Sequence, residues 1–511
     1  MNQHYDVAVV GGGVGGAYAA WRLQMGDTSP SSPLPSDPTQ RSIALFELSD
    51  RIGGRLQSIV PPGMENLQAE FGGMGFTSND ALVNALVALF KLQTTPFPHG
   101  GASNLLYLRG VRFTNAQATD PSIVPYRLAP GEQGIDPRGL VPATIEKVFP
   151  GCSTWRQEQW DKATSAPYNG RSLSDTGFWN FLLENMSNEA LSYARDAYGH
   201  FFEVANWNCA QALPWFMLDG TATYSTLADG YDQLPLTLAK SFSGAGGNVL
   251  MSTSVASVQQ VTTGPQGQTT MEITTAGGDS CTADAVVFAL PRRSLELITS
   301  DVLAEPSVRA LVSSVSGQPV MKVFCCYESM WWKPLGITAG SSGTDLPIGQ
   351  VWYFGPDSDT NPNSLLLATY DDTLSTTFWE GLQSGPRFPS GNAVDPHWTE
   401  QAPSADMVAE IQRQLTEMHG MAIPAPYSAS WKDWTEDPYG GAFNTWNVDV
   451  EADSVAQAIL QPDSSVPLYI CGEAYSHDQG WVEGALDTAE QVVELMGIES
   501  PSWLQAAVPA G

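Results

Sequence analysis

The distribution of hydrophobic and polar positions divides the chain into predicted strands and helices. Residues 5–10 form a short, continuous apolar run, which is typical of a strand buried on both faces of a parallel sheet. Glycines follow at once, and residues 17–23 then show the spacing of a helix. The Ser- and Pro-rich stretch 27–42 has no periodicity and is predicted to be an exposed loop. Further strands are predicted at 43–47, 248–251, 254–258, 270–275, 285–290, 320–327, 348–354, 365–369 and 468–472, and helices at 79–93, 404–419 and 485–496.

The order of these elements predicts a discontinuous α/β domain. A strand followed by a helix occurs at both ends of the chain, so we expect the last pair to complete the domain that the first pair begins. The chain between them carries α+β material, and residues 173–219 are helical and rich in aromatic side chains. Residues 115–172 are rich in Pro and Gly, and their pattern assigns no element.

The composition indicates a globular protein with a strongly acidic surface. With 511 residues, the chain has room for two or three domains. It carries 54 acidic and 23 basic residues, and a net charge of −31 repels nucleic-acid phosphates and anionic membranes. No apolar run reaches the ~20 residues of a transmembrane helix. We therefore expect neither nucleic-acid nor membrane partners.

The N-terminus and the cysteine and histidine spacings complete this first picture. No charged segment and apolar segment precede the first strand, so the predicted location is the cytoplasm, with export by another route left open. The six cysteines show no CxxC spacing, and the six histidines form no HxxxH or HExxH pair. We therefore expect buried free thiols and no metal site.

A glycine-rich turn after the first strand predicts a dinucleotide site. The run Gly11-Gly-Gly13-Val-Gly15-Gly16 follows a strand and opens a helix. Gly11 allows the tight turn, Gly13 lets backbone N–H groups approach a pyrophosphate, and Gly16 permits close packing of helix on sheet. Glu47 ends the second strand, where its carboxylate is predicted to accept hydrogen bonds from the adenosine ribose.

The run Arg51-Ile-Gly-Gly-Arg55 is a more specific signal. Its two glycines let the chain pass close to a diphosphate, which arginine neutralises. In this order, the glycine turn, Glu47 and this run resemble the flavin-containing amine oxidase family, which includes monoamine, polyamine and L-amino acid oxidases and uses FAD. The resemblance extends over nearly the whole chain, through residues 69–74, 230–235, 255, 285–291, 472–473 and 480–485.

The resemblance implies which residues contact FAD. By this match Gly73 and Met74 pass the flavin ring, and the backbone of Val255 meets adenine. Glu473 is expected to bind the ribityl chain. The backbone N–H of Val482 is expected to face the pyrimidine edge of the flavin, where it can stabilise negative charge.

The same match assigns residues to the substrate side of the flavin. Lys322 resembles the family's lysine that holds a water near flavin N5, and an apolar pocket would depress its pKa. Phe443 and Trp481 match the two aromatic positions that wall the substrate channel, and a tryptophan at the second is typical of L-amino acid oxidases. Gly480 matches the glycine whose carbonyl accepts a hydrogen bond from the substrate amine.

The binding of a substrate carboxylate is the point at which the sequence departs from L-amino acid oxidases. Tyr353 is expected to offer its hydroxyl to the carboxylate, with Trp352 as the neighbouring candidate. Many L-amino acid oxidases have an arginine at the position of Gly75 that clamps the carboxylate. The candidate replacements for this arginine are Arg109, Arg112 and Arg127.

These features imply an FAD-dependent oxidative deamination of an L-amino acid. A hydride passes from the alpha carbon to flavin N5, the imine hydrolyses to a 2-oxo acid and ammonia, and O₂ yields hydrogen peroxide. Oxidation of a primary amine that lacks a carboxylate, which Gly75 favours, and an L-amino acid monooxygenase are the alternatives. A flavin-binding protein without turnover is disfavoured because Lys322 and both channel aromatics are present.

The expected fold class is α/β, with a Rossmann-like FAD-binding domain of the glutathione-reductase type, an α+β substrate-binding domain and a helical insertion. The cysteine that attaches FAD covalently in monoamine oxidases is replaced by Ala442, so non-covalent FAD is expected. The expected partners are a small amino acid or amine and O₂, and a homodimer is left open. The predicted domains are FAD-binding (1–78, 225–310 and 460–511), substrate-binding (79–114 and 311–459) and helical or irregular (115–224).

Overall fold

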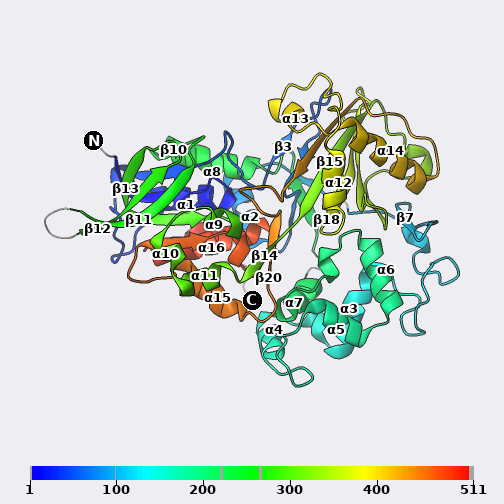
Figure 1. Ribbon diagram of the computed structural model, residues 1–511, viewed down its shortest axis with the longest axis horizontal. Coiled ribbons are helices and arrows are strands. Elements are labelled where there is room, and N and C mark those ends of the chain that lie inside the picture. Colours follow the sequence, from blue (N-terminus) through cyan, green and yellow to red (C-terminus); the bar gives the residue numbers. More distant parts are fainter. Residues whose placement is uncertain (1–2, 98, 219–221, 264–267, 506–511) are drawn as a thin grey trace.

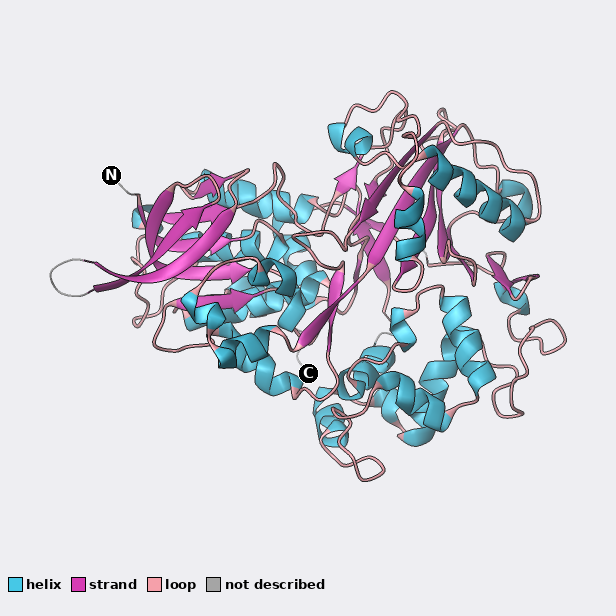
Figure 2. Cartoon of the chain, viewed as in Figure 1, coloured by secondary structure: helices cyan, strands magenta, loops and turns pink. Residues whose placement is uncertain are grey.

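The computed structural model describes residues 3–97, 99–218, 222–263 and 268–505. Its elements form three groups (Figure 1). A sheet covered by helices lies on the left of the view, a second sheet lies at the upper right, and a group of helices lies at the lower right. Figure 2 shows that the first two groups mix strands and helices, whereas the third is helical.

The first sheet joins strands from distant parts of the chain. Its strands are β1 (His4–Val10), β2 (Ile43–Phe46), β10 (Asn248–Leu250), β11 (Val255–Thr263), β12 (Gln268–Thr275), β13 (Ser280–Ala289) and β21 (Leu468–Cys471). The parallel part has the order β10-β2-β1-β13-β21, and the antiparallel β12 and β11 extend it beyond β13. All four side chains of β2 are buried, as expected for a parallel strand covered on both faces.

Helices cover both faces of this sheet. On one face, α1 and its neighbours share a hydrophobic core with Val7 and Val9 of β1. On the other face, a second core includes Ala8 and Val10 of the same strand. The first set consists of α1 (Val14–Met25), α2 (Ala81–Phe90), α8 (Gln233–Gly244) and α16 (Val482–Leu495), with α17 (Ser502–Gln505) beside α2. The second set consists of α9 (Arg292–Glu296), α10 (Asp301–Ala304), α11 (Pro306–Val312) and α15 (Ala452–Leu460).

A buried ion pair joins α1 to α16. The guanidinium of Arg22 donates to both carboxylate oxygens of Glu490, at 2.9 and 2.8 Å, and the Tyr18 hydroxyl donates to the same carboxylate at 2.8 Å. The Arg22 and Glu490 side chains are 4% and 6% exposed. The pair therefore fixes the relative position of two helices whose N-termini both reach the cavity described below.

Replacing Glu490 by glutamine is expected to lower the free energy of unfolding by about 3–5 kcal/mol, because the charge of Arg22 would then be buried without a counter-charge. Chemical denaturation measures this change. Glu494→Gln, on an exposed position of the same helix, is the control and should leave the midpoint unchanged. Equal midpoints for the two variants would contradict the structural role of the pair.

The second sheet is mostly antiparallel and has two different faces. Its strands follow the order β19-β15-β18-β17-β16-β7-β8. They are β7 (Leu105–Leu108), β8 (Val111–Thr114), β15 (Val320–Tyr327), β16 (Gly340–Thr344), β17 (Gln350–Pro356), β18 (Ser364–Asp372) and β19 (Ser428–Asp433). One face packs on α14 (Ala405–His419). The other face packs on Phe71, in a segment that runs back toward the first group. The short helix α12 (Thr376–Leu382) packs on the α14 face through Trp379, and α13 (Pro396–Glu400) contacts β19 and packs on the Phe71 face through Trp398.

The third group has its own aromatic core, which includes Trp160, Phe178 and Phe181. Its helices are α3 (Pro137–Val148), α4 (Gln157–Thr164), α5 (Phe178–Asn185), α6 (Asn188–Tyr198) and α7 (Cys209–Leu218). Three small sheets of the described chain lie between the groups. They are β3 (Ser58–Ile59) paired with β4 (Ala69–Glu70), the three-stranded sheet β5 (Phe76–Thr77), β9 (Tyr224–Leu227) and β6 (Thr94–Pro96), and β14 (Val315–Gln318) paired with β20 (Phe443–Trp446). The 3-10 helices are η1 (Pro38–Gln40), η2 (Asn115–Gln117), η3 (Cys152–Thr154), η4 (Phe202–Val204), η5 (Lys333–Leu335) and η6 (Glu473–Tyr475).

The structure confirms the mixed α/β arrangement, and each predicted strand and helix overlaps an observed one. The prediction for residues 115–172 was incomplete, because α3 and α4 both lie within them. Pro137 stands at the start of α3 after the capping residue Asp136, and Pro142 lies inside this helix. Proline is tolerated in the first turn of a helix, but a proline-rich stretch hides the helical period.

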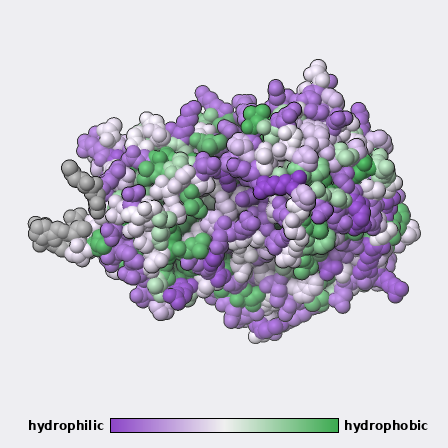
Figure 3. All heavy atoms as spheres, turned by 45° about the horizontal axis from the view of Figure 1, so that its top comes forward, coloured by the Kyte–Doolittle hydropathy of each residue, from purple (hydrophilic) through white to green (hydrophobic). Residues whose placement is uncertain are grey.

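The visible surface is mostly hydrophilic (Figure 3). On the face shown in Figure 3, hydrophilic residues predominate and hydrophobic ones are scattered between them. Over the described ranges, no helix is both long enough and apolar enough to cross a membrane. The six cysteines are buried and unpaired.

Candidate functional site

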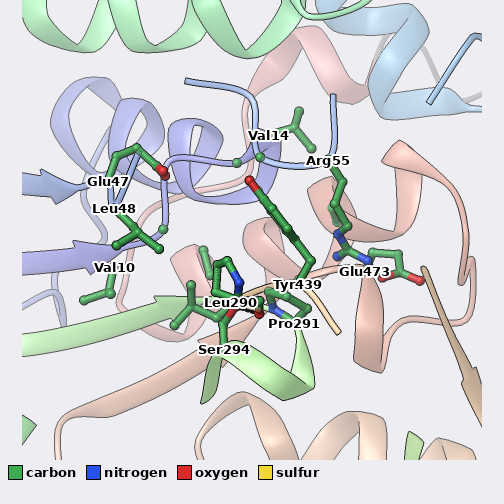
Figure 4. A pocket seen from close by; sticks show the side chains of 18 of the residues that line it. Val10, Val14, Glu47, Leu48, Arg55, Leu290, Pro291, Ser294, Tyr439 and Glu473 are labelled. Atoms are coloured by element: carbon green, nitrogen blue, oxygen red, sulfur yellow. Dashed lines mark hydrogen bonds and ion pairs between the residues drawn. The ribbon is translucent and has the colours of Figure 1, made fainter. Parts of the chain in front are cut away.

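A cavity of about 560 Å³ extends from the carboxyl ends of β1 and β2 to the N-terminus of α16. Figure 4 shows Glu47 on the left of the view and the paired side chains of Arg55 and Glu473 on the right, with Tyr439 between them. A site at the carboxyl ends of parallel strands is where α/β sheets bind ligands. The predicted contact residues that line it are Gly11, Gly13, Gly15, Glu47, Arg55, Gly73, Val255, Phe443, Glu473, Gly480, Trp481 and Val482.

The glycine turn has the conformation that its sequence requires. Gly11 has φ +107°, and a Cβ there would lie 2.5 Å from the carbonyl oxygen of Ala289. A Cβ on Gly16 would overlap the carbonyl oxygen of Gly11, so this glycine lets α1 pack against the turn although it does not line the cavity. A Cβ on Gly13 would meet no atom closer than 3.9 Å, so its backbone borders open space. Since α1 begins at Val14, the first N–H groups of a helix point into this space.

Glu47 holds the edge of the turn from the adjacent strand. The N–H of Gly12 donates to its carboxylate at 2.7 Å, and the N–H of Ser49 donates to the other oxygen at 2.8 Å. The hydroxyl of Ser49 also donates to this second oxygen, at 2.6 Å. The oxygen that binds Gly12 keeps a lone pair, which can accept a hydrogen bond from a ribose hydroxyl. Val255, at the start of β11, lines the same end of the cavity.

The second glycine pair packs against the first. A bridge joins Gly13 to Gly53, and a Cβ on Gly54 would lie 3.0 Å from the Cα of Gly13. Arg51 stabilises this turn, since its guanidinium donates to the carbonyl of Leu56 at 2.9 Å and to that of Gly54. The two arginines therefore differ in role, because Arg51 supports the loop while Arg55 lines the cavity.

Arg55 and Glu473 form an ion pair in the middle of the cavity wall. The guanidinium of Arg55 lies 2.7 Å from one oxygen of Glu473 and also donates to the carbonyl of Ala442 at 3.0 Å. The other oxygen of Glu473 accepts from the N–H of Asn444 at 2.8 Å and from that of Gly480 at 2.9 Å. Glu473 thus positions the segment that carries Trp481.

The far end of the cavity is aromatic. Phe443 begins β20, and Trp481 caps the N-terminus of α16, where Val482 is the first helical residue and its N–H has no acceptor within the helix. Gly480 has φ +87°, and a Cβ on it would lie 3.7 Å from the ring of Phe443. This end therefore offers one directed N–H donor between two large apolar walls.

Lys322 lies directly behind this part of the cavity. It is 2% exposed, and its ammonium nitrogen donates to the backbone carbonyls of Glu70, at 3.0 Å, and Gly72. These carbonyls belong to the segment that contains Gly73, which lines the cavity, and Met74, which packs in the adjacent core. Burial lowers the pKa of Lys322 to about 7, an effect that the nearby Glu70 opposes. Burial also raises the pKa of Glu70 to about 8.

The structure corrects the prediction for Tyr353. Side chains alternate between the two faces of a strand, and on β17 it is Trp352 that packs with Phe324 and Phe71 on the face toward the first group. Tyr353 points to the α14 face, where its hydroxyl lies 2.6 Å from the ring nitrogen of His419. Its hydroxyl is therefore directed away from the cavity.

The structure also places the candidate carboxylate-binding arginines outside the lining of the cavity. Arg109 pairs with Glu189, and Arg112 donates to the carbonyls at the end of α14. Arg109, Arg112 and Arg127 are all missing from the described residues that line the cavity. Gly75 itself has little space, because a Cβ there would lie 2.6 Å from the carbonyl oxygen of Ser225.

Several residues near the aromatic end had no assignment from the sequence. Phe202 of η4 contacts the ring of Phe443 at 4.6 Å between centroids, and Tyr224 of β9 lies 6.3 Å from Trp481. Tyr439 and Ser294 line other parts of the cavity and had no assignment either. No local pattern marks such residues, since they come from elements that meet only in the folded chain.

The residues of the cavity fit the FAD that the sequence resemblance implies. The space beside Gly13 is a cradle that any side chain would fill, and the first N–H groups of α1 and α16 provide donors at two separate points. Glu47 follows the end of β2, and Arg55 lies between the glycine turn and the aromatic end of the cavity. This donor set suits a molecule with a ribose, a diphosphate and a ring that accumulates negative charge.

Comparison with known proteins agrees with this description. The profile of the family described as "Flavin containing amine oxidoreductase" matches residues 19–496. Achacin from Lissachatina fulica is 25% identical over 526 residues, which cover 96% of this chain and 92% of achacin. An L-amino-acid oxidase from Mus musculus is 24% identical over 94% of this chain and 69% of its own length.

Solved structures show the same fold at lower identity. Wild-type putrescine oxidase bound to putrescine superimposes with a TM-score of 0.70 at 16% identity. The superposition covers 97% of this chain and 99% of that one.

Proposed function

Because this chain belongs to the flavin-containing amine oxidoreductase family and uses FAD, we propose that it oxidises an L-amino acid at the carbon that bears the amine. In the proposed reaction an L-amino acid, O₂ and water give a 2-oxo acid, ammonia and hydrogen peroxide. FAD, when bound, supplies the hydride acceptor and passes the electrons to O₂. A Rossmann-like sheet built from β1, β2, β10, β13 and β21 is the proposed binding domain.

One observation carries this proposal. A single cavity connects the glycine turn of a dinucleotide site to Phe443 and Trp481, and Lys322 lies immediately behind its wall. An inert flavin carrier would need the glycine turn but would have no use for a buried lysine and an aromatic channel. The combination therefore favours an enzyme over a binding module.

The chain's own residues have distinct proposed tasks. When FAD is bound, the N–H groups at the start of α1 and the side chain of Arg55 would hold its diphosphate, and Glu47 would orient its adenosine ribose. The N–H of Val482 holds the electron-rich edge of the ring. Phe443 and Trp481 exclude water and orient the substrate, whose amine meets the carbonyl of Gly480.

Lys322 is proposed to hold a water molecule rather than the substrate. A neutral amine has two N–H donors and one lone pair. Both donors have acceptors in the carbonyls of Glu70 and Gly72, so the lone pair remains for a water on the side of the cavity. A pKa near 7 makes this neutral form accessible at neutral pH.

A primary amine without a carboxylate is the second candidate substrate. The glycine at position 75 favours it. So does the lining of the cavity, because Arg55 is the one arginine among the described lining residues and it is already paired with Glu473. An amino acid would need its carboxylate to be held by other polar groups near Trp481. Tyr224, whose ring lies 6.3 Å from that of Trp481, and His99, whose ring lies 3.8 Å from that of Tyr224, are candidate groups for this role.

Matched substrate pairs separate the two candidates. The holoenzyme is mixed anaerobically with each L-amino acid, with its D-enantiomer and with the amine that its decarboxylation would yield, and loss of the yellow colour is followed. We expect rapid bleaching by L-amino acids, followed in air by peroxide and ammonia. Bleaching by the amines alone would transfer the assignment to an amine oxidase, and an amide product would indicate a monooxygenase. No bleaching by any member would overturn the proposal.

The Ala442→Cys variant tests where the flavin lies. Ala442 lines the cavity and donates its N–H to the carbonyl of Gln318 at 2.9 Å, so its position is fixed. Wild-type chain precipitated by acid is expected to release its flavin, whereas the cysteine variant should retain a covalently bound fraction. Ser294→Cys, also in the lining, is the control. Retention of flavin by wild-type chain, or complete release from the Ala442→Cys variant, would contradict the placement.

A further inference from the structure

The end of β18 connects Lys322 to the third, helical group of the protein. Tyr370 and Asp372 are two residues apart on this strand, so their side chains point to the same face. The ring of Tyr370 lies 4.6 Å from the ammonium nitrogen of Lys322. Asp371, between them, points to the opposite face.

Two backbone N–H groups of the helical group bind the carboxylate of Asp372, and the hydroxyl of Thr373 donates to one of its oxygens at 3.4 Å. Asp372 is 1% exposed, and its two oxygens accept hydrogen bonds from the N–H of Phe201, at 2.7 Å, and from that of Phe202, at 2.9 Å. A buried carboxylate is costly unless its oxygens are hydrogen-bonded. The two consecutive N–H groups satisfy one oxygen each, and the arrangement fixes the direction of the chain at this point.

The segment held by Asp372 presents an aromatic ring to Phe443, which lines the candidate substrate channel. Phe202 packs edge-on against Phe443, with 4.6 Å between the ring centroids. Phe443 lines the cavity beside Gly480. A second tie lies next to it, because the side chain of Gln350 donates to the carbonyl of Tyr198. The position of Phe202 relative to the channel is therefore set in part from the second sheet, in addition to its packing against Trp215 of its own group.

We propose that Asp372 is a positioning residue that holds Phe202 against Phe443 and thereby sets which substrate side chains the site accepts. The inference rests on the proposed function, since it needs the substrate to lie before Phe443. Asp372 itself touches neither substrate nor cofactor in this scheme. Its effect passes through two backbone hydrogen bonds to one ring.

Paired substitutions of the two adjacent aspartates test the proposal. Asp372→Asn keeps the shape of the side chain but replaces one acceptor oxygen with a donor that faces an N–H group. Asp371→Asn makes the same change at the neighbouring buried position, on the other face. Across substrates graded by side-chain size, we expect Asp372→Asn to change the ratio of kcat/KM for large over small side chains roughly 10-fold. Asp371→Asn should leave this ratio unchanged.

A double-mutant cycle shows whether the effect passes through Phe202. Phe202→Leu alone should shift the selectivity ratio, and Asp372→Asn should add little to it in that background, because coupled residues are not additive. Equal shifts from Asp372→Asn in both backgrounds would overturn the proposal. An unchanged ratio in Phe202→Leu would overturn it even if Asp372→Asn failed to fold.

Amide hydrogen exchange gives a readout that does not need turnover. A peptide spanning residues 199–204 should lose protection in Asp372→Asn and keep it in Asp371→Asn. Equal protection in both variants would reject the anchoring role. If no substrate bleached the wild-type flavin, the proposed function would fail and the role in selectivity with it, while exchange would still decide whether Asp372 anchors the segment.

Discussion

Replacing Lys322 by methionine is expected to lower turnover roughly 100-fold or more while FAD remains bound. Methionine preserves the length and burial of the side chain but removes the nitrogen that donates to the carbonyls of Glu70 and Gly72. Because Lys322 lies behind the lining rather than in it, the change should affect the reaction more than cofactor affinity. Flavin absorbance of the purified variant and peroxide release at saturating substrate measure the two effects.

Separating the two halves of the reaction locates the defect. Anaerobic bleaching should be little changed, whereas return of the yellow colour on mixing with O₂ should be slow, because the proposed water is held for the oxygen step. Lys333→Met, at an exposed position, is the control for loss of a lysine. Full activity in Lys322→Met would remove this residue from the mechanism, and loss of bound FAD would assign it to cofactor binding instead.

The shifted pKa of Lys322 gives this prediction a dependence on pH. If the neutral amine is the active form, the oxygen step should rise as pH increases through about 7, and Lys322→Met should lack this rise. Stability follows the same group. Between about 7 and the ordinary lysine value of 10.5, the unfolded chain binds the proton and the folded chain does not, so stability increases with pH. The stability of the variant relative to wild type should therefore decrease over this interval, as denaturation at pH 7 and pH 9 would show.

Replacing Gly13 by alanine is expected to weaken FAD binding roughly 10- to 100-fold without harming the fold. A Cβ at this position meets no protein atom closer than 3.9 Å, so the apoprotein should tolerate it. The same methyl group projects where the diphosphate must approach the backbone, and overpacking of this kind costs about 1–3 kcal/mol. Titration of apoprotein with FAD, together with thermal unfolding of the apoprotein, measures both quantities.

Two other glycines provide the comparison. Gly16→Ala should destabilise the apoprotein itself, because the new Cβ would overlap the carbonyl oxygen of Gly11. Gly244→Ala, at the end of α8 with no atom within 4 Å of the new Cβ, should change neither affinity nor stability. FAD affinity in Gly13→Ala equal to that of wild type would show that the cofactor does not approach this turn.

Patterns of short range were sufficient to predict much of the molecule. The apolar run of β1, the glycines after it and the start of α1 are consecutive in the sequence, so their geometry follows from local rules. The prediction for Tyr353 failed for a different reason. A one-residue difference in a strand decides the face on which a side chain lies, and the sequence around β17 is apolar on both faces.

The chain by itself determined the family, the cofactor and the positions of the main strands and helices, because each depends on residues that are close in sequence. Tertiary structure alone decided which side chains share a site. Lys322 meets the carbonyls of Glu70 and Gly72, and Phe202 meets Phe443, only because separate segments fold onto one cavity wall. Such contacts depend on how sheets and helices pack in three dimensions, and no periodicity along the chain encodes that packing.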